Sequence, residues 1–200
     1  MDSNHRPTDY ESAALTAELR APAGYTTAVL AAPARTTKPE RQRRKRAFGV
    51  KVHAHDTHFR TAGGLHIRDI TDEVNEVVRE SGIRDGIACV YSPHTTCCVR
   101  VNEFEAGFLE DFATMIRKLV PNDAYYAHDD WDRRTENVCE EDMEVGNGHS
   151  HCMSMLLGSA GESIPVRDGV LALGQWQRVL FIELDRERDR RWLVQVVGNA

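Results

Sequence analysis

The sequence predicts an α+β fold, in which a mainly antiparallel sheet is packed with helices on one face, as a single domain over residues 47–200. Three observations predict this class. Apolar residues alternate in several strand-length segments, and short turns separate most of these segments, which favours antiparallel pairing. Other segments carry apolar residues at helical spacing. No GxGxxG or GxxxxGKS/T motif follows a strand and opens a helix, so a doubly wound nucleotide-binding fold is excluded.

The elements are expected as follows. Strands are predicted at 48–60, 65–70, 86–92, 96–102, 163–167, 170–173, 176–185 and 191–197. A first helix is predicted from Thr71, which is expected to cap it, to Gly82, and a second covers 104–119, where Pro121 ends it. A short third helix is predicted at 149–157. The polar segment 124–145 is long for a plain connection, which favours a functional role.

Charge divides the chain of 200 residues into two parts. Residues 1–46 hold nine Lys and Arg against five Asp and Glu, whereas the remainder holds 16 against 26. The basic run 41–46 is typical of a nuclear-localisation or RNA-binding patch, but its Ala/Thr/Pro-rich surroundings favour a solvated, disordered extension. The acidic body predicts no nucleic-acid partner, because it would repel phosphates.

Apolar runs and cysteines indicate the compartment. The longest apolar runs are a few residues, well below the roughly 20 that cross a bilayer, so no membrane partner is expected. Five cysteines without a CxxC pair do not form a disulfide framework. The first residues lack a basic region followed by an apolar stretch, so no secretory signal is expected. The prediction is a cytoplasmic protein with reduced thiols.

A carboxylate lies within the strand at 176–185. Both faces of this strand are mostly apolar, so the strand is predicted to be central and Glu183 to be at least partly buried. A buried carboxylate is costly unless it is paired, protonated or facing a ligand. Two interpretations stay open: an ion pair with an arginine such as Arg100, or a functional acid. Gln177 shares the face of Glu183 and is predicted to flank the same cleft.

Three histidines lie close together in the sequence. His149 and His151 follow Gly146-Asn147-Gly148, and His128 lies beside two aspartates. In an extended backbone His149 and His151 would point the same way and share a metal ion, whereas in the first turn of a helix they would diverge. A glycine-rich helix start also suits a phosphate. As a set, these histidines predict a functional site.

A further histidine lies in the turn Ser92-Pro93-His94-Thr95-Thr96. His94 and the hydroxyl groups could bind an oxyanion or supply an acid or base, or the threonines could simply bond the local backbone. Cys97 and Cys98 point to opposite strand faces, so at least one is expected to be buried. A catalytic cysteine beside His94 is possible in principle, although no third orienting group is evident.

Several motifs follow one another in the order typical of one family, over residues 48–198. They are Thr71-Asp72-Glu73-Val74, Ser92-Pro93-His94-Thr95-Thr96 with Asn102-Glu103, Asn147-Gly148-His149-Ser150-His151 with Leu156-Leu157-Gly158, and Leu173-Gly174-Gln175-Trp176-Gln177 with Glu183-Leu184-Asp185. In this series the chain resembles the YjbQ family, also called the secondary thiamine-phosphate synthase family. The basic extension at 1–46 lies outside the resemblance.

The resemblance implies a compact α+β homotrimer with clefts lined by the histidine motifs. It also implies a weak thiamine-phosphate synthase activity, as a main or a side reaction, in which a thiazole phosphate nitrogen displaces pyrophosphate from a pyrimidine pyrophosphate. The matching positions here are His94, Thr95, Asn102, Glu103, His128, Asn147, His149, His151, Gln177 and Glu183.

These positions define a hypothesis about roles. His128, His149 and His151 are expected to hold a divalent ion, Zn²⁺ or Mg²⁺, or the pyrophosphate, and His94 and Glu183 are the acid and base candidates. The remaining positions are expected to bind the phosphorylated substrate: Thr95, Asn102, Glu103, Asn147 and Gln177. One alternative is a metal-dependent hydrolase of a phosphorylated small molecule. Another is a non-catalytic trimeric scaffold with a structural metal.

Overall fold

Within the described residues, the helices and strands lie between Lys51 and Asn199. The computed structural model describes residues 49–138, 145–158 and 160–200. The chain divides into the units Met1–Lys45 and Arg46–Ala200. The disordered extension predicted at 1–46 lies outside the described residues.

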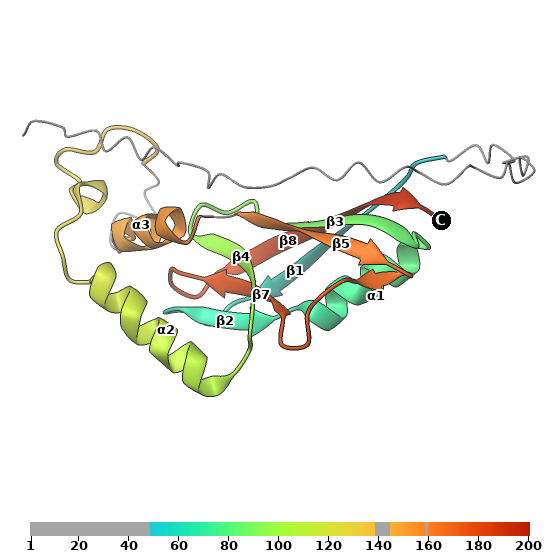
Figure 1. The fold of residues 1–200 in the computed structure, drawn as a ribbon. Helices are drawn as coiled ribbons and strands as arrows, with labels where there is room; N and C mark the ends of the chain where they lie inside the picture. Colours follow the sequence, from blue (N-terminus) through green and yellow to red (C-terminus); the bar gives the residue numbers. More distant parts are fainter. Residues whose placement is uncertain (1–48, 139–144, 159) are drawn as a thin grey trace, which may run out of the picture. The chain divides into compact units, whose positions relative to one another are not determined.

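The strands form two antiparallel sheets. A five-stranded sheet has the order β1 (Lys51–Arg60), β8 (Asp189–Asn199), β3 (Asp85–Tyr91), β5 (Gly161–Arg167) and β6 (Val170–Leu171). A three-stranded sheet has the order β2 (His66–Asp69), β7 (Arg178–Glu183) and β4 (Cys97–Asn102). All the pairings between these strands are antiparallel, which confirms the α+β prediction (Figure 1). The strand β7, which is apolar on both faces, is the central strand of the small sheet.

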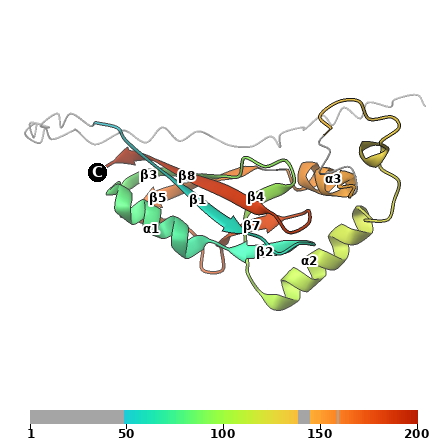
Figure 2. The same cartoon turned by 180° about the vertical axis from the view of Figure 1, so that it is seen from behind.

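Three helices pack against the sheets and build two cores. Helix α1 (Thr71–Ser81) and the small sheet pack on one face of the five-stranded sheet, where Val74, Phe181 and Trp192 belong to the first core (Figures 1 and 2). Helices α2 (Ala106–Leu119) and α3 (Gly148–Leu157) close a second core on the other face of the small sheet. Cys97 belongs to the first core and Cys98 to the second, so the prediction of opposite faces is confirmed, and both are buried.

Helix α1 begins differently from the prediction. Thr71 is the first helical residue and does not cap the helix, because Ile70 occupies the cap position without a side-chain bond. The Thr71 hydroxyl donates to Asp69 Oδ1 at 2.5 Å and accepts from the backbone N–H of Val179 at 2.8 Å. The threonine therefore ties the helix to β7. The helix ends, as predicted, at Gly82, whose φ of 63° is favourable for glycine.

The register of the small sheet separates its two ends. Cys97 lies opposite Glu183 at one end, and Asn102 lies opposite Arg178 at the other. The polar segment 124–138 contains a single 3-10 turn, Ala127–Asp129, which packs near α3. Among the described residues, no helix has the length and apolar character that crossing a membrane requires.

Candidate functional site

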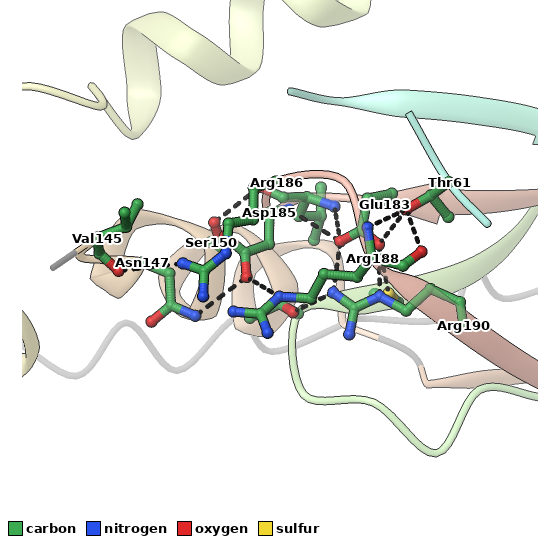
Figure 3. A network of polar contacts seen from close by, with 12 residues as sticks. Thr61, Val145, Asn147, Ser150, Glu183, Asp185, Arg186, Arg188 and Arg190 are labelled. Atoms are coloured by element: carbon green, nitrogen blue, oxygen red, sulfur yellow. Dashed lines mark hydrogen bonds and ion pairs between the residues drawn. The ribbon is translucent and has the colours of Figure 1, made fainter. Parts of the chain in front are cut away.

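Glu183, at the end of β7, is the centre of a buried polar network (Figure 3). Arg190 Nε lies 2.5 Å from Glu183 Oε2 and Nη2 lies 2.7 Å from Oε1, an arrangement with two parallel bonds. Thr61 Oγ1 donates to Oε2 at 3.0 Å, and the backbone N–H groups of Leu184 and Asp185 donate to Oε1. The Glu183 side chain is 0% exposed. Both carboxylate oxygens are therefore saturated by donors within the protein.

The partner of Glu183 is not the one suggested by the sequence. Arg100 instead pairs with Glu162 at 3.0 Å. Burial favours the neutral form of Arg190, but its bond to Glu183 and the nearby negative charge raise its pKa above the ordinary value. Arg190 also donates from Nη2 to Thr96 Oγ1 at 2.9 Å. Glu183 thus fixes the position of a permanently charged guanidinium.

Arg190 faces a cavity of about 400 Å³, which we name the arginine cavity. Its described lining includes three arginines, Arg134, Arg188 and Arg190, two histidines, His128 and His151, and one acidic residue, Asp185. Thr95, Thr96, Asn137 and Asn147 complete the lining. Among the described residues, the charges at this cavity are those of Arg134, Arg188 and Arg190 against Asp185 in the lining and Glu183 behind Arg190, a net charge of +1 that favours an anion.

Asp185, the one carboxylate among the described lining residues of the arginine cavity, is already engaged. Asp185 Oδ2 accepts from Arg188 Nε at 2.8 Å and from Asn147 Nδ2 at 3.2 Å. Burial alone would raise the pKa of Asp185, but hydrogen bonds from Arg186, Asn147 and Arg188 hold it below the ordinary value. Asp185 is therefore ionised near neutral pH, and it orients Arg188 and Asn147 (Figure 3).

The three candidate metal-binding histidines do not form one cluster. The rings of His128 and His151 lie with their centroids 4.5 Å apart. Since α3 begins at Gly148, His149 and His151 point about 200° apart around the helix axis. His149 lies near Tyr126 and lines a different cavity. The sequence left open whether His149 and His151 point the same way or diverge, and in the structure they diverge.

The potential metal ligands among the described residues do not gather into a cluster. Among these residues, no group of three His, Cys, Asp or Glu side chains is placed to hold a divalent metal ion. Asp129, a potential oxygen ligand, caps α3: its Oδ1 accepts from the backbone N–H groups of Asn147 and Gly148, each at 2.9 Å. The amides at this helix start are therefore already bonded to the Asp129 carboxylate, which takes the place that a phosphate would occupy there.

His94 lies beside the arginine cavity with one ring nitrogen occupied. Its Nε2 accepts from the backbone N–H of Arg191 at 3.0 Å. Burial, followed by the charge of Arg190, lowers the pKa of His94 below its ordinary value, so the ring is neutral at pH 7. A neutral imidazole that accepts at Nε2 carries its proton on Nδ1. His94 can therefore donate a hydrogen bond from Nδ1.

The structure brings together only part of the predicted site. Thr95, His128, Asn147 and His151 line the arginine cavity, with Glu183 directly behind Arg190. The remaining candidates lie elsewhere. Asn102, Glu103 and Gln177 belong to the far end of the small sheet, as the pairing of Asn102 with Arg178 shows. There the Asn102 side chain accepts from Glu103 N, and Gln177 Oε1 accepts from Gly174 N, both at 2.8 Å.

Sequence reasoning missed the arginines of the cavity. Arg188 and Arg190 belong to the charged stretch 185–191, which resembles an exposed hairpin tip, and Arg134 lies in the patternless polar segment. The alternation within β8 was the available signal, because Arg190 falls on the same strand face as Trp192 and Val194, which are buried. An arginine on an apolar face requires a buried acid as partner.

These features define an antiparallel, two-sheet α+β protein with an arginine-lined cavity beside a buried Glu–Arg pair. The chain belongs to the UPF0047 family of YjbQ-like proteins, because a family model described as "UPF0047 protein YjbQ-like" matches residues 55–199. The predicted family is thereby confirmed.

Relatives and solved structures agree with this assignment. A UPF0047 protein of Archaeoglobus fulgidus is 41% identical over 139 residues, which cover 70% of this chain and 97% of that protein. One from Methanothermobacter thermautotrophicus is 36% identical over 150 residues, 75% of this chain and 95% of the relative. A crystal structure of a YbjQ-like protein of unknown function from Sulfolobus solfataricus matches with a TM-score of 0.65 and 32% identity, covering 76% of this chain and 100% of that one.

Proposed function

We propose that the arginine cavity binds the phosphate or pyrophosphate group of a small molecule. We further propose that the protein joins a pyrimidine pyrophosphate to a thiazole phosphate with release of pyrophosphate, as a main or a side activity. One observation carries the first part: among the described residues, Arg134, Arg188 and Arg190 line one cavity together with a single carboxylate, Asp185, which is already bonded. The family resemblance supports the particular reaction.

In this reaction the thiazole nitrogen forms a bond to the methylene carbon of the pyrimidine, and the carbon–oxygen bond to pyrophosphate breaks. The departing oxygen takes the electron pair, so negative charge grows on the leaving group. Guanidiniums stabilise that charge without a proton transfer. Arg190 needs no reorganisation to do so, because Glu183 and Thr96 already hold it in place.

His151 contributes a second kind of group to the cavity. Burial, together with the nearby His128 and Arg134, lowers its pKa below the ordinary value. A neutral imidazole can bond a phosphate oxygen without adding a further charge. The hydroxyl groups of Thr95 and Thr96 line the same cavity and supply additional hydrogen-bond donors. The cavity thus combines charged and neutral donors around one anion.

Calorimetric titration of inorganic pyrophosphate tests the binding proposal. Arg188→Met removes a charge from the cavity, and we expect it to weaken binding by about tenfold or more, since hydrogen bonds to charged groups contribute about 1.5–3 kcal/mol. Arg79→Met is the matched control, because Arg79 is exposed on α1, where it pairs with Glu76. Equal affinity of the two variants would show that the cavity is not the anion site.

Product analysis tests the reaction. With both substrates present we expect thiamine phosphate and one pyrophosphate for each molecule formed. Release of inorganic phosphate or pyrophosphate from the pyrimidine pyrophosphate without the thiazole would instead identify a hydrolase. Unchanged substrates together with tight pyrophosphate binding would leave an anion-binding protein of another class.

Assembly and compartment are part of the same proposal. We propose a homotrimer, as the family resemblance implies, located in the cytoplasm. Light scattering on the purified full chain should give a particle mass three times that of one chain. A monomer at micromolar concentration would contradict the trimer, and imaging of a tagged full chain tests the location.

A further inference from the structure

A second cavity adjoins the arginine cavity and differs from it in charge. This cavity, of about 430 Å³, is named here the Ser92 cavity, and its walls include Tyr91, Ser92, Pro93, Ser154 and Met155. None of the described residues that line it is an Asp, Glu, Lys or Arg. Thr95 and His151 line both cavities, so the two spaces meet at these side chains.

The Ser92 cavity contains an unusual polar atom. Ser92 is 0% exposed, and its Oγ has no hydrogen-bond partner among the described residues. Buried hydroxyl groups nearly always have a partner, because leaving one unpaired is unfavourable. The neighbouring Ser154 differs, since its Oγ donates to the Cys97 carbonyl oxygen. Ser92 is one of the residues that line the cavity, so a small adjustment of its side chain would bring the unpaired Oγ within reach of a group that enters.

We propose that the Ser92 cavity is a subsite for the uncharged ring of a phosphorylated substrate, with Ser92 Oγ donating a hydrogen bond to a heteroatom of that ring. The inference rests on the proposed binding of the phosphate in the arginine cavity. The phosphate group of one ligand then lies in the arginine cavity, and its ring lies in the Ser92 cavity. The bond between these two parts lies where the cavities meet, beside Thr95 and His151.

The chemistry of the walls selects a neutral aromatic ring. Tyr91, Pro93 and Met155 supply apolar surface, and a methionine sulfur makes favourable contacts with aromatic rings. His94 and His151 are the titratable imidazoles at this cavity, and burial favours the neutral form of both. A charged ring would find no counter-ion among the described lining, whereas a neutral heteroaromatic ring would have both apolar contact and a hydroxyl donor.

Dissociation constants for a series of probes test the subsite on the full-length protein. The series consists of inorganic pyrophosphate, methyl phosphate, benzyl phosphate and the three pyridylmethyl phosphates. We expect benzyl phosphate to bind about tenfold more tightly than methyl phosphate, because the ring buries apolar surface. One pyridyl isomer should gain about a further threefold or more from the hydroxyl of Ser92.

Ser92→Ala tests whether Ser92 causes the tighter binding of one pyridylmethyl phosphate relative to benzyl phosphate. Its fold should be unaffected, because Ser92 Oγ has no partner to lose. In Ser92→Ala we expect the best pyridylmethyl phosphate to bind no more tightly than benzyl phosphate, while the affinity for pyrophosphate stays constant. The control Ser163→Ala, at an exposed position of β5, should change neither of these affinities. Equal affinities for benzyl and methyl phosphate in the wild-type protein overturn the ring subsite and leave the anion site standing. Failure of pyrophosphate and all the phosphate esters to bind overturns both proposals.

Discussion

Arg190 lies between Glu183 and the arginine cavity, with its Nε 2.5 Å from one carboxylate oxygen and its Nη2 2.7 Å from the other. The two residues are seven positions apart, on either side of the turn between β7 and β8. Glu183 therefore acts through Arg190, as a positioning residue. This differs from a general acid or base, which would need to reach a ligand itself.

Removal of the Glu183 charge should destabilise the fold strongly. Glu183→Gln leaves Arg190 buried and without its counter-charge, and breaking such a pair costs about 3 kcal/mol or more of unfolding free energy. Glu162→Gln is the control, since its partner Arg100 is 43% exposed, and it should cost less than about 1 kcal/mol. Urea unfolding gives both values.

A double variant separates the ion pair from the shape of the site. Glu183→Gln combined with Arg190→Met should recover part of the lost stability, because no unpaired charge is then buried. The double variant should still bind pyrophosphate poorly, since the Arg190 guanidinium is gone. Full recovery of pyrophosphate affinity in that variant would exclude Arg190 from the anion site.

Chelation of divalent ions should not abolish pyrophosphate binding. The described part of the chain offers guanidiniums around the cavity, but no set of three metal ligands. We therefore expect calorimetry with EDTA present to give an affinity within about threefold of that without it, well below the tenfold step of about 1.4 kcal/mol. Loss of binding in EDTA, restored by Zn²⁺ or Mg²⁺, would show that an ion is required after all.

The fold was more predictable than the site, for physical reasons. Alternation and helical spacing are local, so β7 with its two apolar faces and the stripe of α1 at Val74, Val77 and Val78 could be recognised from the sequence. The burial of Glu183 followed from the same alternation. Its choice of Arg190 over Arg100 did not, because pairing depends on how the turn between β7 and β8 folds back.

The histidines illustrate the same limit. His149 and His151 are two positions apart, and whether they converge depends on where α3 begins. The sequence left both outcomes open, and the cap supplied by Asp129, 18 residues from Asn147, decides between them. Contacts of this kind join segments that are far apart in the sequence, so the sequence alone does not show that they lie close together in space.

Acidification should reduce stability partly through Asp69. Its carboxylate bonds Thr71 and lies 2.6 Å from Arg178 Nε. Partial burial opposes ionisation, but the bonds from Thr71 and Arg178 hold the pKa of Asp69 below its ordinary value. The stability that it contributes is therefore present above its unfolded pKa of about 3.9 and is lost as the pH falls through the lower folded pKa.

Asp69→Asn tests this contribution. The variant should be less stable by about 1–2 kcal/mol at pH 7, and the difference should shrink below about pH 4, as measured by urea unfolding at several pH values. Asp72→Asn is the control, because Asp72 meets the same Arg178 at 3.4 Å but is 86% exposed. A constant difference between Asp69→Asn and the wild type from pH 7 to pH 2 would contradict the assignment.

The start of α3 should tolerate no side chain at Gly148. A Cβ atom there would lie 2.5 Å from the Cβ of Tyr126, and Gly148 N also bonds the Asp129 carboxylate. Gly148→Ala must shift one of these contacts, which costs about 1–3 kcal/mol. Gly49→Ala, where nothing lies within 4 Å, is the control and should be neutral in thermal unfolding. Equal melting temperatures of the two variants would show that the helix start is not tightly packed.

The cysteines should differ sharply in reactivity, which bears on whether one beside His94 is a nucleophile. Cys97 and Cys98 are both buried. Burial, followed by the negative charge of Glu183, raises the pKa of Cys97, and burial raises that of Cys98 to about 12, so the reactive thiolate of each is scarce at pH 7. Cys152, by contrast, is exposed on α3.

Alkylation of the native protein with iodoacetamide, followed by peptide mass spectrometry, measures this difference. We expect Cys152 to react at least about a hundredfold faster than Cys97 or Cys98, since burial raises the pKa of the latter two thiols and shields them from the reagent, whereas Cys152 is exposed. In urea the three rates should converge, because the difference comes from the fold. Rapid native labelling of Cys97 would show that it has thiolate character, and a catalytic cysteine next to His94 would then have to replace the anion-site chemistry proposed here.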